Sequence, residues 1–180
     1  RRVPGSGPAG TPGRGGSGAR HGFSPSEIKH FAKVSKLSTR DVLRRLQAAG
    51  LDSIPGGGAE VLSDRVRQIL APRKTMAAEW IAIMEEAHAL GLRSTATMMF
   101  GHVETLPERV EHLLRVRESQ DRTGGYNAFI GWTFQPNRTP LMERPELAAQ
   151  VEARGYRGAL DYLRTLAVAR VALDNFRNVQ

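Results

Sequence analysis

The sequence has 180 residues and carries 26 Lys and Arg against 18 Asp and Glu, which gives a formal net charge of +8. Hydrophobic residues make up 40% of it, enough for a packed core, and no apolar run approaches the ~20 residues needed to cross a bilayer. The chain contains no cysteine. Disulfides, thiolate catalysis and cysteine-held zinc or iron–sulfur sites within this chain are therefore excluded.

The first 22 residues differ in composition from the rest. They are rich in Gly and Pro and hold four arginines but no acidic residue, so they carry half of the net charge. Such a segment buries too little apolar surface to offset the entropy lost on ordering, so we predict a disordered tail over 1–22 and a folded domain over 23–180. The tail has no aromatic residue to stack on a base, which disfavours nucleic acid as a partner.

Apolar spacing and turn residues predict the elements of the folded domain. Helices with apolar residues three or four apart are predicted at about 24–34, 38–49, 59–70, 75–90, 105–117 and 159–173. Extended runs bounded by Gly or Pro predict strands at 51–54, 95–100 and 126–134. Alternating strands and helices indicate an α/β fold with parallel strands and right-handed crossovers. Since a complete eight-unit barrel needs ~250 residues, the chain can form half a barrel at best.

In such folds the functional site lies beyond the carboxyl ends of the strands. The first strand ends at the glycines Gly56, Gly57 and Gly58, which allow the backbone to approach a ligand, and Glu60 is expected in the first turn of the following helix. The alternative is a flexible loop followed by an acid that stabilises the helix. A run of glycines alone is a weak signal.

The other two strand ends also carry polar residues. Gly101, His102 and Glu104 follow the second strand, and His102 is a weak catalytic candidate because its ordinary pKa suits proton transfer. The alternative is a glycine turn with a solvated histidine. Trp132 and Gln135 lie at the end of the third strand, where an aromatic ring and an amide could form one side of a binding site for a flat ligand. The alternative is that this strand belongs to the core.

Longer strings in the chain resemble the radical SAM enzymes of the futalosine route to menaquinone. The similar strings are GLDSIPGGGAE at 50–60, STATMMFGHVET at 94–105, QDRTGG at 120–125, FQP at 134–136, YLRTLA at 162–167 and LDN at 173–175. The resemblance extends over residues 23–180. The residues at 52–54 and 98–100 are most similar to those of the cyclase that acts on dehypoxanthine futalosine. The aminofutalosine synthase and the deazaflavin-cofactor synthase subunit remain alternatives.

The resemblance implies a TIM-like radical SAM barrel in the cytoplasm that uses S-adenosylmethionine, a 4Fe-4S cluster and a small nucleoside substrate, with no membrane contact. It implies cofactor-binding roles for Glu60, Arg67, Gly101 and Glu104, with Arg65 as an alternative to Arg67. It implies that substrate contacts come from the residues of the glycine loop and the third strand end, namely Gly56, Gly57, Gly58, Trp132 and Gln135.

The chain departs from this family where the cluster should bind. The family holds its cluster with a CxxxCxxC loop after the first strand, and no residue of this chain is cysteine. We therefore expect a fragment that contains only the second half of the barrel, has no metal ligands and performs no radical chemistry alone. The alternative function is a non-catalytic half-barrel that binds an anionic partner such as RNA through its basic tail.

Overall fold

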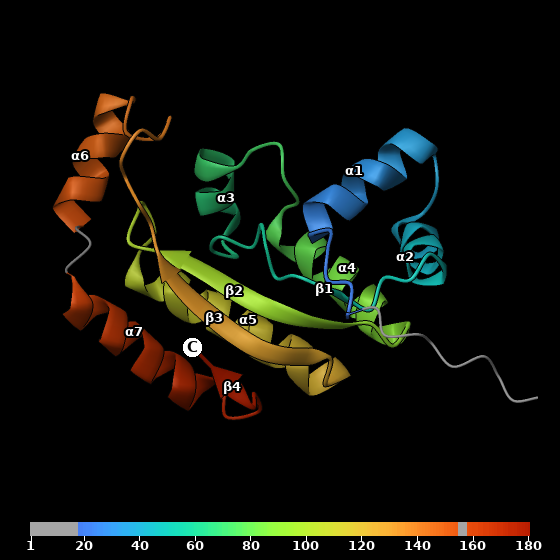
Figure 1. The fold of residues 1–180 in the computed structure, drawn as a ribbon. Helices are drawn as coiled ribbons and strands as arrows, with labels where there is room; N and C mark the ends of the chain where they lie inside the picture. The colour runs from blue at the N-terminus through green and yellow to red at the C-terminus, as the bar shows by residue number, and fades with distance from the viewer. Residues whose placement is uncertain (1–17, 155–157) are drawn as a thin grey trace, which may run out of the picture.

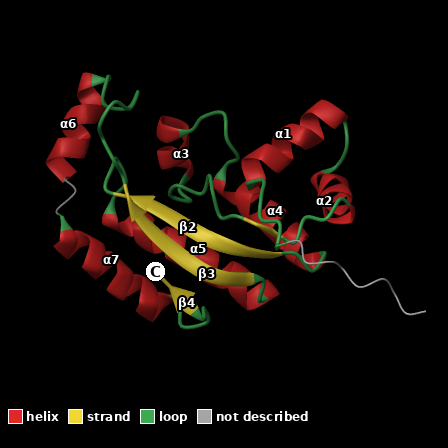
Figure 2. Cartoon of the chain, viewed as in Figure 1, coloured by secondary structure: helices red, strands yellow, loops and turns green. Residues whose placement is uncertain are grey.

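The computed structural model describes residues 18–154 and 158–180. Its centre is one parallel sheet of four strands, β1 (Ser53–Ile54), β2 (Arg93–Phe100), β3 (Tyr126–Thr133) and β4 (Asn178–Val179), in the spatial order β1-β2-β3-β4 (Figure 2). Each strand pairs with the next one along the chain, as in a (β/α) barrel, whereas the order reverses in a doubly wound sheet. The predicted α/β class and the partial TIM-like architecture are confirmed.

The described residues contain seven helices, of which the first two precede β1 and the other five connect the strands. They are α1 (Pro25–Ser35), α2 (Thr39–Ala48), α3 (Asp64–Leu70), α4 (Ala77–Ala89), α5 (Leu106–Thr123), α6 (Pro145–Arg154) and α7 (Ala159–Ala172) (Figure 1). Helix α5 begins with the capping box that its sequence predicts, because Thr105 Oγ1 accepts from the Glu108 amide while the Glu108 carboxylate accepts from the Thr105 amide. Within the described residues no helix is both long enough and apolar enough to span a membrane.

The two faces of the sheet have different surroundings. One face is covered by helices: the Phe100 ring stacks on Tyr162 of α7, and the Tyr126 ring meets His88 of α4. The other face, called here the open face, carries Thr95, Thr97 and Met99 of β2 and their register neighbours Ala128, Ile130 and Trp132 of β3. In Figure 1 it is turned towards the viewer, with α5 behind the strands. The core therefore lies between the sheet and the helices.

Three elements differ from the predictions. The predicted helix at 59–70 begins only at Asp64, because residues 57–63 form turns and bends and Glu60 has a φ of +47°. Glu60 is therefore not in a helical turn. Helix α6 and strand β4 were not predicted, since α6 follows a Pro-rich turn region and β4 has only two residues, one of them a polar Asn.

The end of the predicted tail is ordered. His21 forms a parallel bridge with Ser53 of β1, and Arg20 donates from its guanidinium to the Ala49 carbonyl at 3.1 Å. The Asp52 amide donates to the Arg20 carbonyl at 3.0 Å. Residues 20–22 thus extend the sheet beyond β1. The rest of the predicted tail, residues 1–17, lies outside the described residues, and RNA binding through it stays a prediction.

Candidate functional site

The turns that follow β1, β2 and β3 lie together at the carboxyl edge of the sheet. The Met99 amide donates to the Glu60 carbonyl at 2.9 Å, which joins the first turn to the end of β2. The Phe134 amide donates to the Phe100 carbonyl at 2.7 Å, which joins the second turn to the third. The Phe134 ring also meets the His102 ring edge-on, with centroids 5.9 Å apart. The three strand ends predicted to form a site are therefore brought together.

The glycine loop lies directly against β2. The Gly56 amide donates to Thr95 Oγ1 at 2.9 Å, and Thr97 Oγ1 donates to the Gly56 carbonyl at 2.6 Å. A Cβ atom at Gly56 would lie 2.6 Å from the Thr95 carbonyl oxygen, so only glycine fits there. Gly58 has a φ of +77°, which also favours glycine. Gly57 has neither constraint and is partly exposed, which leaves it as the glycine available to a ligand.

Arg67 is buried beneath this loop. Its Nε donates to the Thr75 carbonyl at 2.6 Å, and its Nη2 donates to the Gly58 carbonyl at 2.8 Å. Its Nη1 donates to the Ala59 carbonyl. The side chain is fully buried, and burial lowers the pKa of the guanidinium. Arg67 therefore holds the glycine loop in shape, and its guanidinium is not presented to a ligand.

Glu60 and Arg65 have different surroundings. The Glu60 carboxylate accepts from Lys74 Nζ at 2.8 Å, and its side chain keeps 13% of its exposure. Arg65 forms two hydrogen bonds to the Glu108 carboxylate, at 2.8 and 2.6 Å, which raise the pKa of the guanidinium. Glu60 is thus an acid at the rim whose carboxylate has, among the described residues, one hydrogen bond, to the exposed Lys74.

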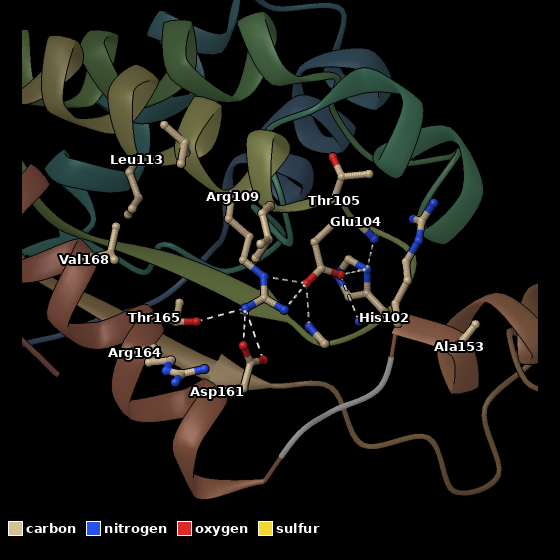
Figure 3. Close-up of a pocket in the computed structure, with 14 residues that line it drawn as sticks. His102, Glu104, Thr105, Arg109, Leu113, Ala153, Asp161, Arg164, Thr165 and Val168 are labelled. Atoms are coloured by element: carbon tan, nitrogen blue, oxygen red, sulfur yellow. Dashed lines mark hydrogen bonds and ion pairs between the residues drawn. The ribbon is translucent and has the colours of Figure 1, made fainter.

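The turn after β2 is closed by its own glutamate (Figure 3). Glu104 Oε1 accepts from the Gly101 amide at 2.6 Å, and Oε2 accepts from the His102 amide at 2.8 Å. Burial alone would raise the pKa of Glu104, but the hydrogen bond and charge of His102, the Gly101 amide and the charge of Arg109 together lower it to about 2. Glu104 is therefore a buried carboxylate whose oxygens are both occupied by protein donors.

His102 is enclosed by the same turn. Its Nδ1 lies 2.8 Å from the Val103 amide nitrogen and 2.8 Å from Glu104 Oε2, and its Nε2 lies 2.9 Å from the Met99 carbonyl oxygen. The residue is 1% exposed. Both ring nitrogens contact protein atoms, so the position of His102 supports a role in holding the turn and offers no proton to a ligand.

Arg109 is a site residue that sequence reasoning missed. Its Nε donates to Glu104 Oε1 at 2.8 Å, while Nη1 donates to both oxygens of Asp161 at 3.1 Å and to Thr165 Oγ1 at 2.9 Å (Figure 3). Its guanidinium also lies 4.8 Å from the centre of the Phe100 ring. Arg109 therefore links Glu104 to Asp161. No spacing pattern in the sequence could predict this link, because Arg109 and Asp161 are 52 positions apart.

The third strand end faces solvent. Trp132 is 47% exposed on the open face, beside Met99 in the register. Gln135 is exposed, and its Nε2 donates to Thr133 Oγ1 at 3.2 Å. Phe134 is buried and packs against the His102 ring. That Trp132 and Gln135 form one side of a binding site for a flat ligand stays a prediction.

The described residues do not fit an iron–sulfur cluster. They contain no group of three or more His, Asp or Glu side chains that could hold a metal ion, and the sequence has no cysteine. The cluster that the resemblance implies needs cysteine thiolates. No ligand set for it is provided by this chain.

The chain is similar to known proteins of the family that its sequence strings resemble. No family model matches the chain. It is 45% identical over 160 residues to the cyclic dehypoxanthine futalosine synthase of Streptomyces coelicolor, covering 89% of this chain and 38% of that protein. It is 44% identical over 158 residues to the aminodeoxyfutalosine synthase of Thermus thermophilus, covering 88% of this chain and 41% of that protein.

A third relative is named for a different reaction. The chain is 42% identical over 151 residues to the 5-amino-6-(D-ribitylamino)uracil–L-tyrosine 4-hydroxyphenyl transferase 1 of Methanosarcina acetivorans, covering 84% of this chain and 39% of that protein. The chain thus spans about two fifths of the length of the relatives it matches. The predicted family is confirmed: the chain is a homologue of the cyclic dehypoxanthine futalosine and aminodeoxyfutalosine synthases, of which it matches only the carboxyl-terminal half.

Proposed function

We propose that this chain is the ligand-facing, carboxyl-side part of a radical SAM cyclase that acts on dehypoxanthine futalosine in menaquinone biosynthesis, in the cytoplasm. One observation carries the proposal: three strand-end turns meet at one edge of a sequentially ordered parallel sheet, joined by the Glu60–Met99 and Phe100–Phe134 hydrogen bonds. This edge is where (β/α) barrels bind their ligands. We choose the cyclase over its relatives because of the sequence of residues 52–54 and 98–100.

The roles at the rim follow from which polar groups remain accessible. Glu60 is the acid proposed to contact the ammonium or a hydroxyl of S-adenosylmethionine, because the only hydrogen bond of its carboxylate among the described residues is to the exposed Lys74. Gly101 is proposed to let the backbone approach the nucleoside part. Arg67 and Glu104 contribute by shaping the two turns, since their charged atoms are bound inside the protein.

The open face is proposed to hold the nucleoside substrate. The indole of Trp132 offers a half-exposed flat surface, and Gln135 offers an amide beside it. In this proposal Gly57 lies against the substrate, while Gly56 and Gly58 are required by the loop itself. The apolar neighbours of Trp132 on this face, Met99 and Ile130, would keep the ligand away from water.

We also propose that the chain alone performs no radical chemistry, because it supplies no ligand to the cluster. The test is anaerobic reconstitution of the purified chain with iron and sulfide, followed by visible absorption and an assay of S-adenosylmethionine cleavage. The full-length Streptomyces coelicolor relative, treated identically, is the positive control. The expected result is no stoichiometric cluster and no cleavage by this chain. A stoichiometric cluster with cleavage activity would refute the proposal.

A further inference from the structure

Lys74 places an ammonium group on the acid that is proposed to meet S-adenosylmethionine. Its Nζ lies 2.8 Å from Glu60 Oε1, in the only hydrogen bond that the carboxylate makes among the described residues. The Glu60 side chain keeps 13% of its exposure, whereas the Lys74 side chain keeps 45%. The acid is therefore largely enclosed, and solvent reaches the lysine. A primary ammonium that comes from outside needs the place that the Lys74 ammonium already holds.

One guanidinium holds the backbone beside both of these side chains. Arg67 Nε donates at 2.6 Å to the carbonyl of Thr75, one residue after Lys74. Arg67 Nη1 donates to the carbonyl of Ala59, one residue before Glu60. The two backbone segments are thus fixed relative to one another. The Lys74 side chain is less constrained, because its four-carbon stem is flexible and its ammonium donates, within the described residues, to Glu60 alone. Freeing the carboxylate requires only this side chain to move.

A second acid lies near the Lys74 ammonium. Hydrogen bonds from Ser24 are the main cause that lowers the pKa of Glu27, and the charge of Lys74 adds to this effect. The Lys74 stem also lies beside the glycine loop, since a Cβ atom at Gly58 would be 3.8 Å from Lys74 Cδ. A lysine that leaves Glu60 therefore remains exposed to solvent and close to another carboxylate. The displacement costs less than it would if the ammonium were left buried and unpaired.

We propose that Lys74 is an intramolecular competitor for the ligand ammonium at Glu60. It pairs with the carboxylate in the free chain and is displaced when the amino-acid group of S-adenosylmethionine binds. The inference rests on the proposed function, in which Glu60 contacts this group. Lys74 then lowers the affinity of the site, because each binding event breaks the Lys74–Glu60 pair. The opposite arrangement, in which Lys74 stays and binds the ligand carboxylate, predicts the opposite effect of removing the lysine.

The test is isothermal titration calorimetry of the full 180-residue chain with two nucleosides that differ in one group. S-adenosylhomocysteine carries the amino-acid group, and methylthioadenosine has a methyl group in its place. Lys74→Met should tighten the binding of S-adenosylhomocysteine by about 3-fold, since the pair to be broken is exposed on its lysine side. Lys74→Gln should act in the same direction. Lys74→Arg keeps the charge and should not tighten binding, and the affinity for methylthioadenosine should not change in any of the three variants.

Lys29→Met is the matched control. Lys29 Nζ lies 2.6 Å from Glu79 Oε2, and these side chains are 42% and 40% exposed, so the substitution removes a similarly exposed lysine from a different acid. It should leave both affinities unchanged. In the Glu60→Gln chain, Lys74→Met should no longer tighten binding, because the pair is already lost. Circular dichroism checks the folding of each variant, and Lys74 is an exposed residue outside the helices, so loss of folding is not expected.

The outcomes separate this inference from the proposed function. Unchanged or weaker binding of S-adenosylhomocysteine by Lys74→Met would overturn the inference and leave the proposed role of Glu60 in place. The same conclusion would follow from equal tightening by Lys29→Met, or from equal tightening of methylthioadenosine. Failure of every chain to bind either nucleoside would overturn the proposed function of the rim, and the inference with it.

Discussion

Arg109 and Glu104 form a buried salt bridge, with Arg109 Nη2 and Glu104 Oε1 2.8 Å apart and side chains that are 12% and 1% exposed. The bridge joins helix α5 to the turn after β2. Through Asp161, whose Oδ1 lies 3.1 Å from Arg109 Nη1, the same guanidinium also fixes α7. The shape of the Gly101–Glu104 turn at the rim therefore depends on a contact made on the helix side of the sheet.

Removing Arg109 should destabilise the fold. In Arg109→Met the buried carboxylate of Glu104 and the partly buried carboxylate of Asp161 lose their common partner, and we expect the free energy of unfolding to fall by about 3 kcal/mol. Urea unfolding followed by circular dichroism measures this. The control is Arg115→Gln, which breaks the half-exposed pair with Glu111 and should cost under about 0.5 kcal/mol. Equal effects of the two substitutions would contradict the role given to Arg109.

Acid should weaken the fold through Glu104. Its pKa is about 2 in the folded chain, below the ordinary value of 4.5, so the unfolded chain binds a proton first as the pH falls. The stabilisation is complete above about pH 4.5 and is lost between there and about pH 2, with a magnitude of roughly 3 kcal/mol. Urea midpoints measured across this range should fall more steeply for the wild type than for Glu104→Gln. Parallel curves would show that Glu104 does not carry the effect.

His112 should stay neutral in the folded chain well below neutral pH. It is fully buried on α5, its Nδ1 accepts from the Leu62 amide at 3.0 Å, and its Nε2 has no hydrogen-bond partner in the described part of the chain. Burial, with smaller contributions from the charges of Arg67 and Arg115, lowers its pKa to about 3. In the unfolded chain the His112 imidazole takes up a proton near pH 6.5, whereas in the folded chain it does not. The free energy of unfolding therefore decreases as the pH falls from about 6.5 to about 3.

Nuclear magnetic resonance of the ring nitrogens tests this directly. The Nε2-protonated tautomer is expected, because Nδ1 accepts a hydrogen bond. The shifts of both nitrogens should not change between pH 7.5 and about 5. A protonation midpoint for His112 above about pH 5 in the folded chain would contradict the prediction.

The glycine loop allows a matched comparison. Gly56→Ala places a Cβ 2.6 Å from the Thr95 carbonyl oxygen, so the loop must move away from β2 at a cost of about 2 kcal/mol. At Gly57 the nearest atom to an added Cβ is 3.7 Å away and φ is not positive, so Gly57→Ala should change stability by less than about 0.5 kcal/mol. Urea unfolding of both variants measures the difference. If the two variants are equally stable, the close approach of the loop to β2 is wrong.

Trp132 should report on a ligand at the open face. Of the two tryptophans, Trp80 is fully buried and Trp132 is 47% exposed. Addition of S-adenosylmethionine or dehypoxanthine futalosine should quench the fluorescence of the wild type, and the quenching should disappear in Trp132→Phe. Urea unfolding of this variant should show a stability change under about 1 kcal/mol, because the ring is half exposed. Quenching that persists in Trp132→Phe would place the ligand elsewhere.

Local patterns in the sequence predicted most of the fold. The capping box at Thr105 and Glu108 and the apolar runs of β2 and β3 are signals contained within a few neighbouring residues, and these elements are where they were predicted. The start of α3 was predicted too early. Residues 59–63 have a composition compatible with a helix, but Arg67 binds the carbonyls of Gly58 and Ala59 and holds that stretch in a turn.

The meeting of the three strand ends was predicted, but the partners of the charged side chains there were not. Parallel strands place their carboxyl ends at one edge, so the convergence of the three turns followed from the order of the elements. The partners of Glu104 and Arg67 did not follow, because each charged group could face a ligand or the protein interior. Contacts between residues far apart in the sequence, such as Arg109 with Asp161, determine whether a charged group faces a ligand or the protein interior. Such contacts cannot be predicted from a single sequence.

The most direct test of the central claim is complementation. The part of the Streptomyces coelicolor relative that precedes the matched region, which is expected to contain the cysteine loop, is co-expressed with this chain and reconstituted anaerobically with iron and sulfide. The predicted result is cleavage of S-adenosylmethionine by the pair and by neither part alone, with loss of cleavage when Glu60→Ala is introduced. Cleavage by this chain alone, or a co-purified pair that holds a cluster without cleaving S-adenosylmethionine, would contradict the claim.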